Sequence, residues 1–373
     1  MFYPIVLFIM TLVYGYGSWR LIGYVSTPWN ILSALIVVAL ALSPLLAVRM
    51  REHSRLRRLG DLYCWVAYGS FGFFILLTCA FLVRDVAGIL LRWSGLIPIA
   101  DAPLDAATLG VSCLLALWGL YQARRTPAVR HVEVPIDELP PELDGLRIAH
   151  ISDLHVGPTI KKPFVHRLVE LTNAQQPDLV AFTGDMADGP VERLASDVAP
   201  LARLSAPLGL FSVTGNHEYY SGVSDWIAQA EYLGFNVLLN DSQIVEHAGR
   251  RIAVVGVTDY GAGEMLPAHR SDPQGALAAA PQADFVLFLA HQPRSVHAAS
   301  GAQLQLSGHT HGGQFIPWKY IVPLQQTYLA GLYRHESTWL YVHRGSGYWG
   351  PPLRLGAPSE IAIHILRRRT ACR

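Results

Sequence analysis

The chain has 373 residues, with 29 Lys and Arg against 28 Asp and Glu, so its formal net charge at pH 7 is +1. Proteins that bind nucleic acid usually carry a basic footprint, so this balance predicts no nucleic-acid partner. Apolar residues make up 51% of the chain and charged residues only 15%, which indicates a membrane segment. The four cysteines have neither paired nor metal-ligand spacing, so neither a disulfide framework nor a zinc–thiolate site is expected.

The first 125 residues hold nearly all of the long apolar runs. Each of four runs lacks Asp, Glu, Lys and Arg and approaches the roughly 20 residues that cross a bilayer. These runs are residues 4–19, 31–48, 62–83 and 107–123. We therefore expect residues 1–125 to form an all-α transmembrane anchor of about four helices. A transporter is the alternative, but ion pathways usually carry ionisable residues within the spans, and these runs have none.

Arginines predict the orientation of these helices. Five arginines lie within residues 49–60, and Arg124 and Arg125 follow the fourth run. Because the other loops are less basic, the positive-inside rule places both ends of the chain in the cytoplasm. The expected location is a bacterial-type inner membrane, crossed several times, with a cytoplasmic C-terminal domain. Residues 85–99 are apolar enough to lie in the outer interface, and the C-terminal domain changes sides if they cross instead.

From residue 126 to residue 373, short apolar strands alternate with amphipathic helices. Helices are predicted at residues 162–175, 191–204 and 224–233. Strands are predicted at residues 129–134, 146–152, 179–182, 208–213, 237–239, 252–257, 285–289, 304–306, 340–343 and 361–366. Strand–helix–strand spacing predicts a largely parallel sheet, and the later strands, where helices become rare, suggest a second sheet. We expect these residues to form one α/β domain.

Side chains suited to metal binding follow the apolar strands at five places. These are Asp153-Leu154-His155, Gly184-Asp185 with Asp188, Gly215-Asn216-His217-Glu218, His291, and Gly308-His309-Thr310-His311. Parallel folds place their sites at the carboxyl ends of strands, so we expect these blocks to converge. Oxygen and imidazole ligands without thiolates suit Mn, Fe or Zn. Two such ions about 3.5–4 Å apart can polarise a phosphoryl oxygen, which favours hydrolysis of a phosphate ester.

The five blocks, in this order across residues 146–314, resemble the calcineurin-like metallophosphoesterase superfamily. The tail is similar to the YkuE-like branch with N-terminal transmembrane helices, through Arg344-Gly345-Ser346-Gly347, Gly350-Pro351-Pro352-Leu353-Arg354 and Pro358-Ser359-Glu360-Ile361. The resemblance implies a four-layer αββα sandwich over residues 126–373 and two divalent metal ions. One ion would be bound by Asp153, His155, Asp185 and His311. The other would be bound by Asp185, Asn216, His291 and His309.

The resemblance also implies roles for residues that do not bind metal. His217 would face the phosphate, stabilise the transition state and protonate the leaving oxygen. Asp188 and Glu218 would orient ligands or hold the tautomer of His217. Asp188 could instead cap a helix, because Asp is common before helices. The guanidinium of Arg344, if it lies near the site, could grip phosphate with two hydrogen bonds.

We therefore expect a membrane-anchored di-metal phosphoesterase that cleaves a phosphodiester or pyrophosphate bond by attack of a metal-bridging hydroxide. Tethering at the membrane suggests a lipid-linked or nucleotide-sugar substrate. A phosphomonoesterase is an alternative of the same class. An alternative of another class is a membrane scaffold or sensor whose phosphoesterase domain binds metal without catalysis. The residues indicate no particular oligomeric state and no particular substrate-binding side chain.

Overall fold

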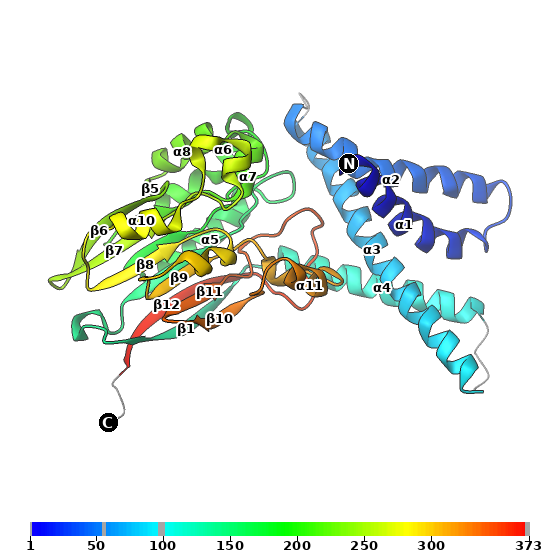
Figure 1. Cartoon of the computed structure of the whole chain (residues 1–373). Coiled ribbons are helices and arrows are strands. Elements are labelled where there is room, and N and C mark those ends of the chain that lie inside the picture. Colours follow the sequence, from blue (N-terminus) through cyan, green and yellow to red (C-terminus); the bar gives the residue numbers. More distant parts are fainter. Residues whose placement is uncertain (1, 54–56, 96–100, 370–373) are drawn as a thin grey trace. The chain divides into compact units, whose positions relative to one another are not determined.

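A computed structural model of the chain describes residues 2–53, 57–95 and 101–369 (Figure 1). The chain divides into two compact units. The helical unit comprises Met1–Arg124 and Gly350–Leu355, and the α/β unit comprises Arg125–Trp349 and Gly356–Arg373. The chain therefore enters the helical unit a second time, through a segment close to the C-terminus. In that segment the Arg354 backbone N–H donates to the Gly119 carbonyl at 3.0 Å, and the Arg354 side chain is buried.

The described residues of the helical unit form four helices. They are α1 (Phe2–Ile22), α2 (Trp29–His53), α3 (Arg57–Trp93) and α4 (Asp101–Arg124). Among the described residues, three helices are long and apolar enough to cross a membrane: Trp29–Ala47, Arg57–Trp93 and Asp101–Arg124. The expected count of four spans is therefore approximate. Exposed apolar side chains such as Leu35 (63%) and Leu114 (68%) fit a surface that faces lipid, because soluble surfaces rarely expose large apolar patches.

The third helix differs from the expectation. We predicted a span at residues 62–83 followed by an interfacial segment at 85–99, but α3 continues unbroken to Trp93, over 37 residues. Such a helix is about 56 Å long, well beyond the roughly 30 Å of hydrocarbon. Arg84 and Asp85 lie within it and form an ion pair of 2.7 Å, and Arg20 of α1 pairs with Asp85 at 2.5 Å. The prediction for residues 96–99 lies outside the described residues.

In the α/β unit, residues 125–349 and 356–369 form two six-stranded sheets. The first has the order β1 (Ala128–Asp137), β12 (Glu360–Arg369), β2 (Arg147–Ile151), β3 (Leu179–Phe182), β4 (Leu210–Ser212) and β5 (Phe235–Val237). The second has the order β10 (Gly331–His335), β11 (Thr338–Val342), β9 (Leu304–Ser307), β8 (Phe285–Leu289), β7 (Arg250–Gly256) and β6 (Asp241–His247). Strands β2 to β5 are mutually parallel, and so are β7, β8, β9 and β11. The predicted parallel sheet and second sheet are both present.

Helices and short 3₁₀ turns connect the strands. The α-helices are α5 (Lys162–Ala174), α6 (Val191–Val198), α7 (Asn216–Ser221), α8 (Val223–Tyr232), α9 (Ala262–Met265), α10 (Pro273–Ala279) and α11 (Trp318–Ile321). The 3₁₀ turns are Pro141–Leu143, Ala199–Arg203, Pro267–His269, Pro293–Ala298, His311–Gly313 and Val322–Leu324. The helix expected at residues 191–204 is thus α6 followed by a 3₁₀ turn, in which Pro200 lacks the N–H that a continuing helix would need.

The core lies between the two sheets. Ile148 of β2, Phe211 of β4, Leu287 of β8 and Tyr341 of β11 belong to one buried cluster that both sheets contribute to. Because the inner face of each sheet is occupied in this way, the crossover helices take the outer faces. Helices α5, α6 and α8 connect the strands of the first sheet, and α10 packs on β6 and β7 of the second, as Figure 1 shows. This arrangement confirms the predicted αββα fold.

Candidate metal centre

All of the predicted metal ligands follow carboxyl ends of parallel strands. They are Asp153 and His155 after β2, Asp185 after β3, Asn216 after β4, His291 after β8, and His309 and His311 after β9. The strands belong to both sheets, so the site draws on both halves of the sandwich. Parallel strands aim these loops the same way, which explains how blocks more than 150 residues apart come together.

The first group of ligands consists of Asp153, His155 and His311. One ligand atom from each of these buried residues lies within 4.8 Å of the others. The Nε2 atoms of His155 and His311 are 3.0 Å apart, and His311 Nε2 lies 3.5 Å from Asp153 Oδ1. The Asp153 carboxylate also accepts the backbone N–H of His309 at 2.9 Å, which holds it in place. Two imidazoles and a carboxylate thus face one small volume.

The second group consists of Asp185, His291 and His309, whose ligand atoms also lie within 4.8 Å of one another. His291 Nε2 lies 3.3 Å from Asp185 Oδ2 and 3.2 Å from His309 Nδ1. The side-chain oxygen of Asn216 lies 3.1 Å from the nearest ring nitrogen of both histidines. This group therefore combines two imidazoles, a carboxylate and an amide oxygen.

One oxygen atom connects the two groups. Asp185 Oδ2 lies 3.3 Å from His291 Nε2 in the second group and 3.6 Å from His155 Nε2 in the first. Its other oxygen, Oδ1, accepts the backbone N–H of His217 at 2.9 Å. A carboxylate has enough lone pairs to serve two neighbouring cations, so the position of Asp185 fits a shared ligand.

The side-chain atoms at this centre are arranged to bind cations rather than to form hydrogen bonds with one another. His291 Nδ1 must carry a hydrogen, because its partner at 2.7 Å is the Thr183 carbonyl oxygen, which only accepts. If a metal ion displaces the second proton of the ring, Nε2 presents a lone pair on the side where a carboxylate oxygen, an amide oxygen and another imidazole converge. Lone pairs that converge in this way repel unless a positive charge lies between them. The residues therefore fit divalent cations.

The pKa values of two histidines at the centre also favour a bound cation. Burial lowers the pKa of His291, but the carboxylates of Asp185, Asp153 and Asp259 outweigh burial and raise it well above its usual value. These carboxylates therefore favour a positive charge at this position, which is a proton on His291 in the metal-free centre and would be a cation when metal binds. Burial and the neighbouring His291 charge lower the pKa of His309 to about 3, so this ring is neutral and its nitrogen can bind a cation.

The loops of the centre have an unusual backbone. Asp153, His155, Asp185, His309 and His311 all have positive φ, between 49° and 70°. Such conformations cost about 1 kcal/mol or more for residues other than glycine, and they persist where the surroundings impose them. Gly184 also has a positive φ, of 90°, and a side chain there would overlap the backbone at Gly215. The loops after β3 and β4 therefore pack closely only because these two positions are glycine.

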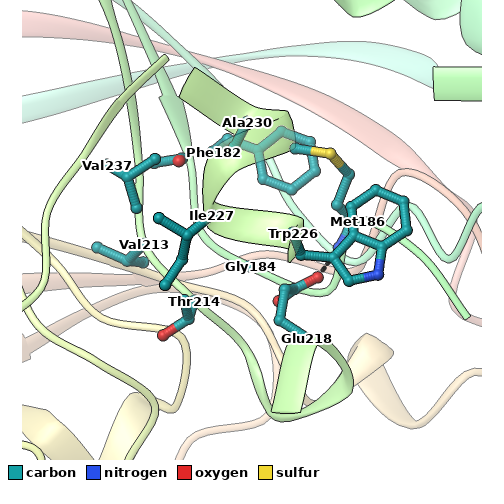
Figure 2. A pocket seen from close by; sticks show the side chains of 11 residues that line it. Phe182, Gly184, Met186, Val213, Thr214, Glu218, Trp226, Ile227, Ala230 and Val237 are labelled. Atoms are coloured by element: carbon teal, nitrogen blue, oxygen red, sulfur yellow. Dashed lines mark hydrogen bonds between the residues drawn. The ribbon is translucent and has the colours of Figure 1, made fainter. Parts of the chain in front are cut away.

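Glu218 holds the Asp185 loop. Its carboxylate accepts backbone N–H groups from Gly215 at 2.7 Å, Asp185 at 2.9 Å and Met186 at 2.7 Å. It lines a cavity of about 20 Å³ together with Trp226. Figure 2 shows both side chains. Burial, helped by the Asp185 charge, raises the pKa of Glu218 to about 7. Glu218 thus contacts the loop backbone, which fits the positioning role implied for it.

Asp188 joins two imidazoles. Its Oδ1 lies 2.9 Å from Nδ1 of His155 and 2.6 Å from Nδ1 of His217. These contacts place a hydrogen on Nδ1 of each ring, and Nε2 of His155 faces His311 and Asp185 at the centre. Helix α6 begins at Val191 and its N-cap is Pro190, so the interpretation of Asp188 as a helix cap is wrong.

His217 lies beside the first group. Its ligand atom is within 4.8 Å of those of His155 and Asp185, so distance alone would allow it to bind metal. Its contact with Asp188 favours the proton-donating role instead. Burial lowers the pKa of His217, but the charges of Asp185 and Asp188 outweigh burial and raise it to about 9. Its ring centroid lies 5.3 Å from that of Tyr220 and 5.8 Å from that of Trp349.

The contacts of Arg344 do not favour the alternative that its guanidinium binds phosphate. Its Nη1 lies 2.7 Å from Glu360 Oε2, and its backbone N–H donates to Glu360 Oε1 at 3.1 Å. A guanidinium paired with a buried carboxylate has less charge to offer a phosphate. The contact instead ties the loop after β11 to the start of β12.

Sequence reasoning missed several residues near the centre. Asp259 follows β7 just as Asp153 follows β2, so the strand-end rule that selected the other ligand blocks could have found it. Gln292, which is next to His291, donates to Asp259 at 3.0 Å. Tyr220 and Trp349 carried no signal in the sequence, because their proximity to His217 depends on the fold.

The chain is similar to known proteins. Residues 146–313 match the family described as calcineurin-like phosphoesterase, and this range contains every proposed ligand. A Bos taurus protein named "Transmembrane protein with metallophosphoesterase domain" is 35% identical, over 82% of this chain and 74% of that protein. A Danio rerio protein of the same name is 37% identical, over 69% of this chain and 61% of that protein.

Bacterial relatives are also similar. The "Uncharacterized metallophosphoesterase YkuE" of Bacillus subtilis is 32% identical, over 61% of this chain and 82% of that protein. Among solved structures, a 5'-nucleotidase precursor from Thermus thermophilus is 17% identical over 58% of this chain and 54% of that chain, with a TM-score of 0.37, too low to carry an argument. The transmembrane relatives and the apolar helices support membrane association. By its match to the bovine and bacterial proteins, the chain belongs to the calcineurin-like phosphoesterase family.

Proposed function

We propose that this protein is a membrane-anchored phosphoesterase that uses two divalent metal ions to hydrolyse a phosphodiester or pyrophosphate bond. One observation carries the proposal: Asp185 Oδ2 lies between two groups of convergent lone pairs, 3.3 Å from His291 Nε2 and 3.6 Å from His155 Nε2. In this proposal residues 1–125 are the transmembrane anchor and residues 126–373 are the catalytic domain.

We assign seven residues to the two ions. One ion takes Asp153, His155, Asp185 and His311, and the other takes Asp185, Asn216, His291 and His309. Oxygen and nitrogen donors without thiolate suit Mn, Fe or Zn. When bound, two such ions supply Lewis acidity to a phosphoryl oxygen and lower the pKa of water. With these ions bound, the centre would attract an anionic phosphate.

The protein's own proton donor is His217. In the metal-free centre the charges of Asp185 and Asp188 raise the pKa of this ring to about 9, which favours its protonated form. Asp188 holds its Nδ1 at 2.6 Å, so the Nε2–H is the hydrogen that can be delivered. An imidazolium beside the phosphate stabilises developing negative charge and can protonate the departing oxygen. Asp188 and Glu218 position this machinery without contacting the phosphate.

Membrane tethering supports a lipid-linked or nucleotide-sugar substrate, because the anchor raises the local concentration of lipid phosphates around the domain. The arginine pattern supports a cytoplasmic catalytic domain in a bacterial-type inner membrane. A non-catalytic sensor is the main rival. The presence of His217 together with its orienting partner Asp188 favours the enzyme, because metal binding alone requires neither a proton donor nor its tautomer control.

The test uses the full-length protein in detergent, loaded with Mn. We expect it to hydrolyse bis-(p-nitrophenyl) phosphate faster than p-nitrophenyl phosphate, and a panel of pyrophosphates and lipid phosphates identifies the natural class. His217→Ala should lose turnover while it retains both ions by elemental analysis, and Asp185→Asn should lose metal and turnover together. If the wild-type protein binds two ions yet hydrolyses none of these esters, the sensor is favoured. If the monoester is the faster substrate, the protein is a phosphomonoesterase.

A further inference from the structure

One short segment of the α/β unit exposes several large apolar side chains. The segment comprises residues 315–324 and includes α11 and the 3₁₀ turn that follows it. Ile316, Tyr320, Ile321 and Leu324 are all exposed, Tyr320 at 67% and Leu324 at 83%, and these four side chains are called the apolar patch below. Large apolar side chains gathered on a surface mark a place that binds a partner or a membrane.

Both ends of this segment are fixed beside the candidate metal centre. At Gly313, two residues after His311, φ is 74° and a side chain would overlap the backbone of Lys319 in α11. The helix α11 therefore packs directly on the turn that carries a metal ligand. Beyond the other end of the segment, Gln326 is buried, and its Nε2 donates to Oε1 of Gln292, the neighbour of another ligand, at 3.3 Å. These contacts hold the segment in place while the apolar patch stays exposed.

Trp349 links the segment to the proton donor and to the membrane helices. Gln314, which precedes the segment, donates from Nε2 to the Trp349 carbonyl at 2.9 Å and accepts the Trp349 backbone N–H at 3.0 Å. The Trp349 side chain is exposed, and its ring centroid lies 5.8 Å from that of His217. The next residues along the chain, Gly350–Leu355, belong to the helical unit. The segment is thus bonded to the residue at which the chain leaves the α/β unit for the apolar helices.

The composition of the segment suits the surface of a bilayer. Rings such as those of Trp318 and Tyr320 are enriched at the level of the lipid headgroups, and the exposed Lys319 can extend its amine to lipid phosphates. Residues 301–335 contain neither Asp nor Glu, so none of their side chains repels an anionic leaflet. The apolar helices associate the chain with a membrane, which gives the bilayer a higher local concentration than any soluble partner.

We propose that the apolar patch inserts into the lipid–water interface of the membrane that holds the helices, as a second membrane contact beside the metal centre. Because α11 packs on the turn of His311, this contact brings the centre to the surface of that leaflet. One consequence rests on the phosphoesterase function proposed above: the substrate is a phosphate ester of a lipid within that leaflet, rather than a soluble nucleotide sugar. The membrane contact itself does not depend on that function.

The experiment uses the full-length protein in nanodiscs of anionic phospholipid, one chain per disc, with a phospholipid that carries a diazirine near its glycerol. After illumination, mass spectrometry identifies the peptides that carry lipid, and the apolar helices are the positive control. We expect residues 316–324 to carry lipid at least about tenfold more often than the peptide around Tyr232, an exposed aromatic residue of α8. Lipid on the helices with only the Tyr232 level on residues 316–324 would overturn the proposal, because the patch would then be covered by protein or remain in water.

Variants locate the contact. The double variant Ile321→Gln and Leu324→Gln changes two exposed side chains and leaves the buried core intact, and it should reduce lipid crosslinking of the segment by at least about fivefold. Tyr232→Gln is the matched control and should keep the wild-type level. Crosslinking of the double variant at the wild-type level would also overturn the proposal.

Activity tests the consequence for the substrate. The Mn-loaded protein is given the p-nitrophenyl phosphodiester of a diacylglycerol in the same discs, or ethyl p-nitrophenyl phosphate in solution. The double variant should lower the ratio of the two rates, lipid ester to soluble ester, by at least about fivefold. An unchanged ratio would overturn the lipid substrate while the crosslinking result stands. Failure of the wild-type protein to hydrolyse either ester would overturn the proposed function and leave the membrane contact intact.

Discussion

Replacing Asp188 by Asn tests whether one carboxylate controls two imidazoles. The substitution keeps the shape of the side chain and one acceptor oxygen, so Nδ1 of His155 and of His217 can still donate. It removes the negative charge from contacts that are now 2.9 and 2.6 Å long. The structure therefore predicts weaker orientation of both rings without a new cavity.

The magnitude follows from the two hydrogen bonds. A bond to a charged group contributes about 1.5–3 kcal/mol, and a neutral bond is roughly half as strong. Loss of the charge from both bonds therefore reduces the stabilisation of the oriented His155 and His217 rings by about 1.5–3 kcal/mol. This corresponds to a decrease of about 10- to 100-fold in turnover. Asp188→Ala removes both bonds and should cost more. It should also weaken binding of the first ion, because His155 would no longer be held.

The assay measures kcat and KM on the best diester with saturating Mn, alongside the metal content of each protein. Asp188→Asn should lower kcat and retain both ions. The matched control is Asp197→Asn, a buried carboxylate of α6 that accepts the Lys162 N–H at 3.3 Å and lies outside the centre. Wild-type kcat in Asp188→Asn with both ions bound would refute the idea that the negative charge of Asp188 strengthens the orientation of His217.

Three further outcomes are expected. Saturation with Mn at about 100 times its Kd should stabilise the wild-type α/β unit by about 2.7 kcal/mol, or about 5–10 °C in Tm, and Asp185→Asn should show a smaller shift in calorimetry. Burial lowers the pKa of His364 from 6.5 to about 3, so the unfolded chain binds a proton that the folded chain does not, and stability falls as pH drops from 6.5 towards 3. With metal removed by a chelator, the free energy of unfolding of His364→Phe should therefore fall by about 1.4 kcal/mol less per pH unit than that of wild type, as measured by denaturant titration. His166→Gln is the control, and the same pH dependence in both variants would contradict this prediction. Protease should digest the C-terminal unit in inside-out vesicles and spare it in right-side-out vesicles; the reverse pattern would show that the arginine argument fails.

The differences between the predicted and observed folds have simple causes. Strands β6 and β10 were missed because each pairs through one edge only, in an antiparallel hairpin, so much of its surface is polar. The long helix α3 was divided in the prediction because Arg84 and Asp85 interrupt its apolar run. In the structure both side chains find partners, which removes the reason for a break.

The sequence by itself determined the family, the fold class and the seven candidate ligands. This was possible because each ligand block is local: an apolar strand, then one to three polar residues whose direction the strand sets. Only the tertiary structure decided that one oxygen of Asp185 lies between two histidine groups, that Asp188 serves both His155 and His217, and that the Trp349 ring lies beside His217. These relations join side chains from distant segments, and no local pattern encodes the distances between them.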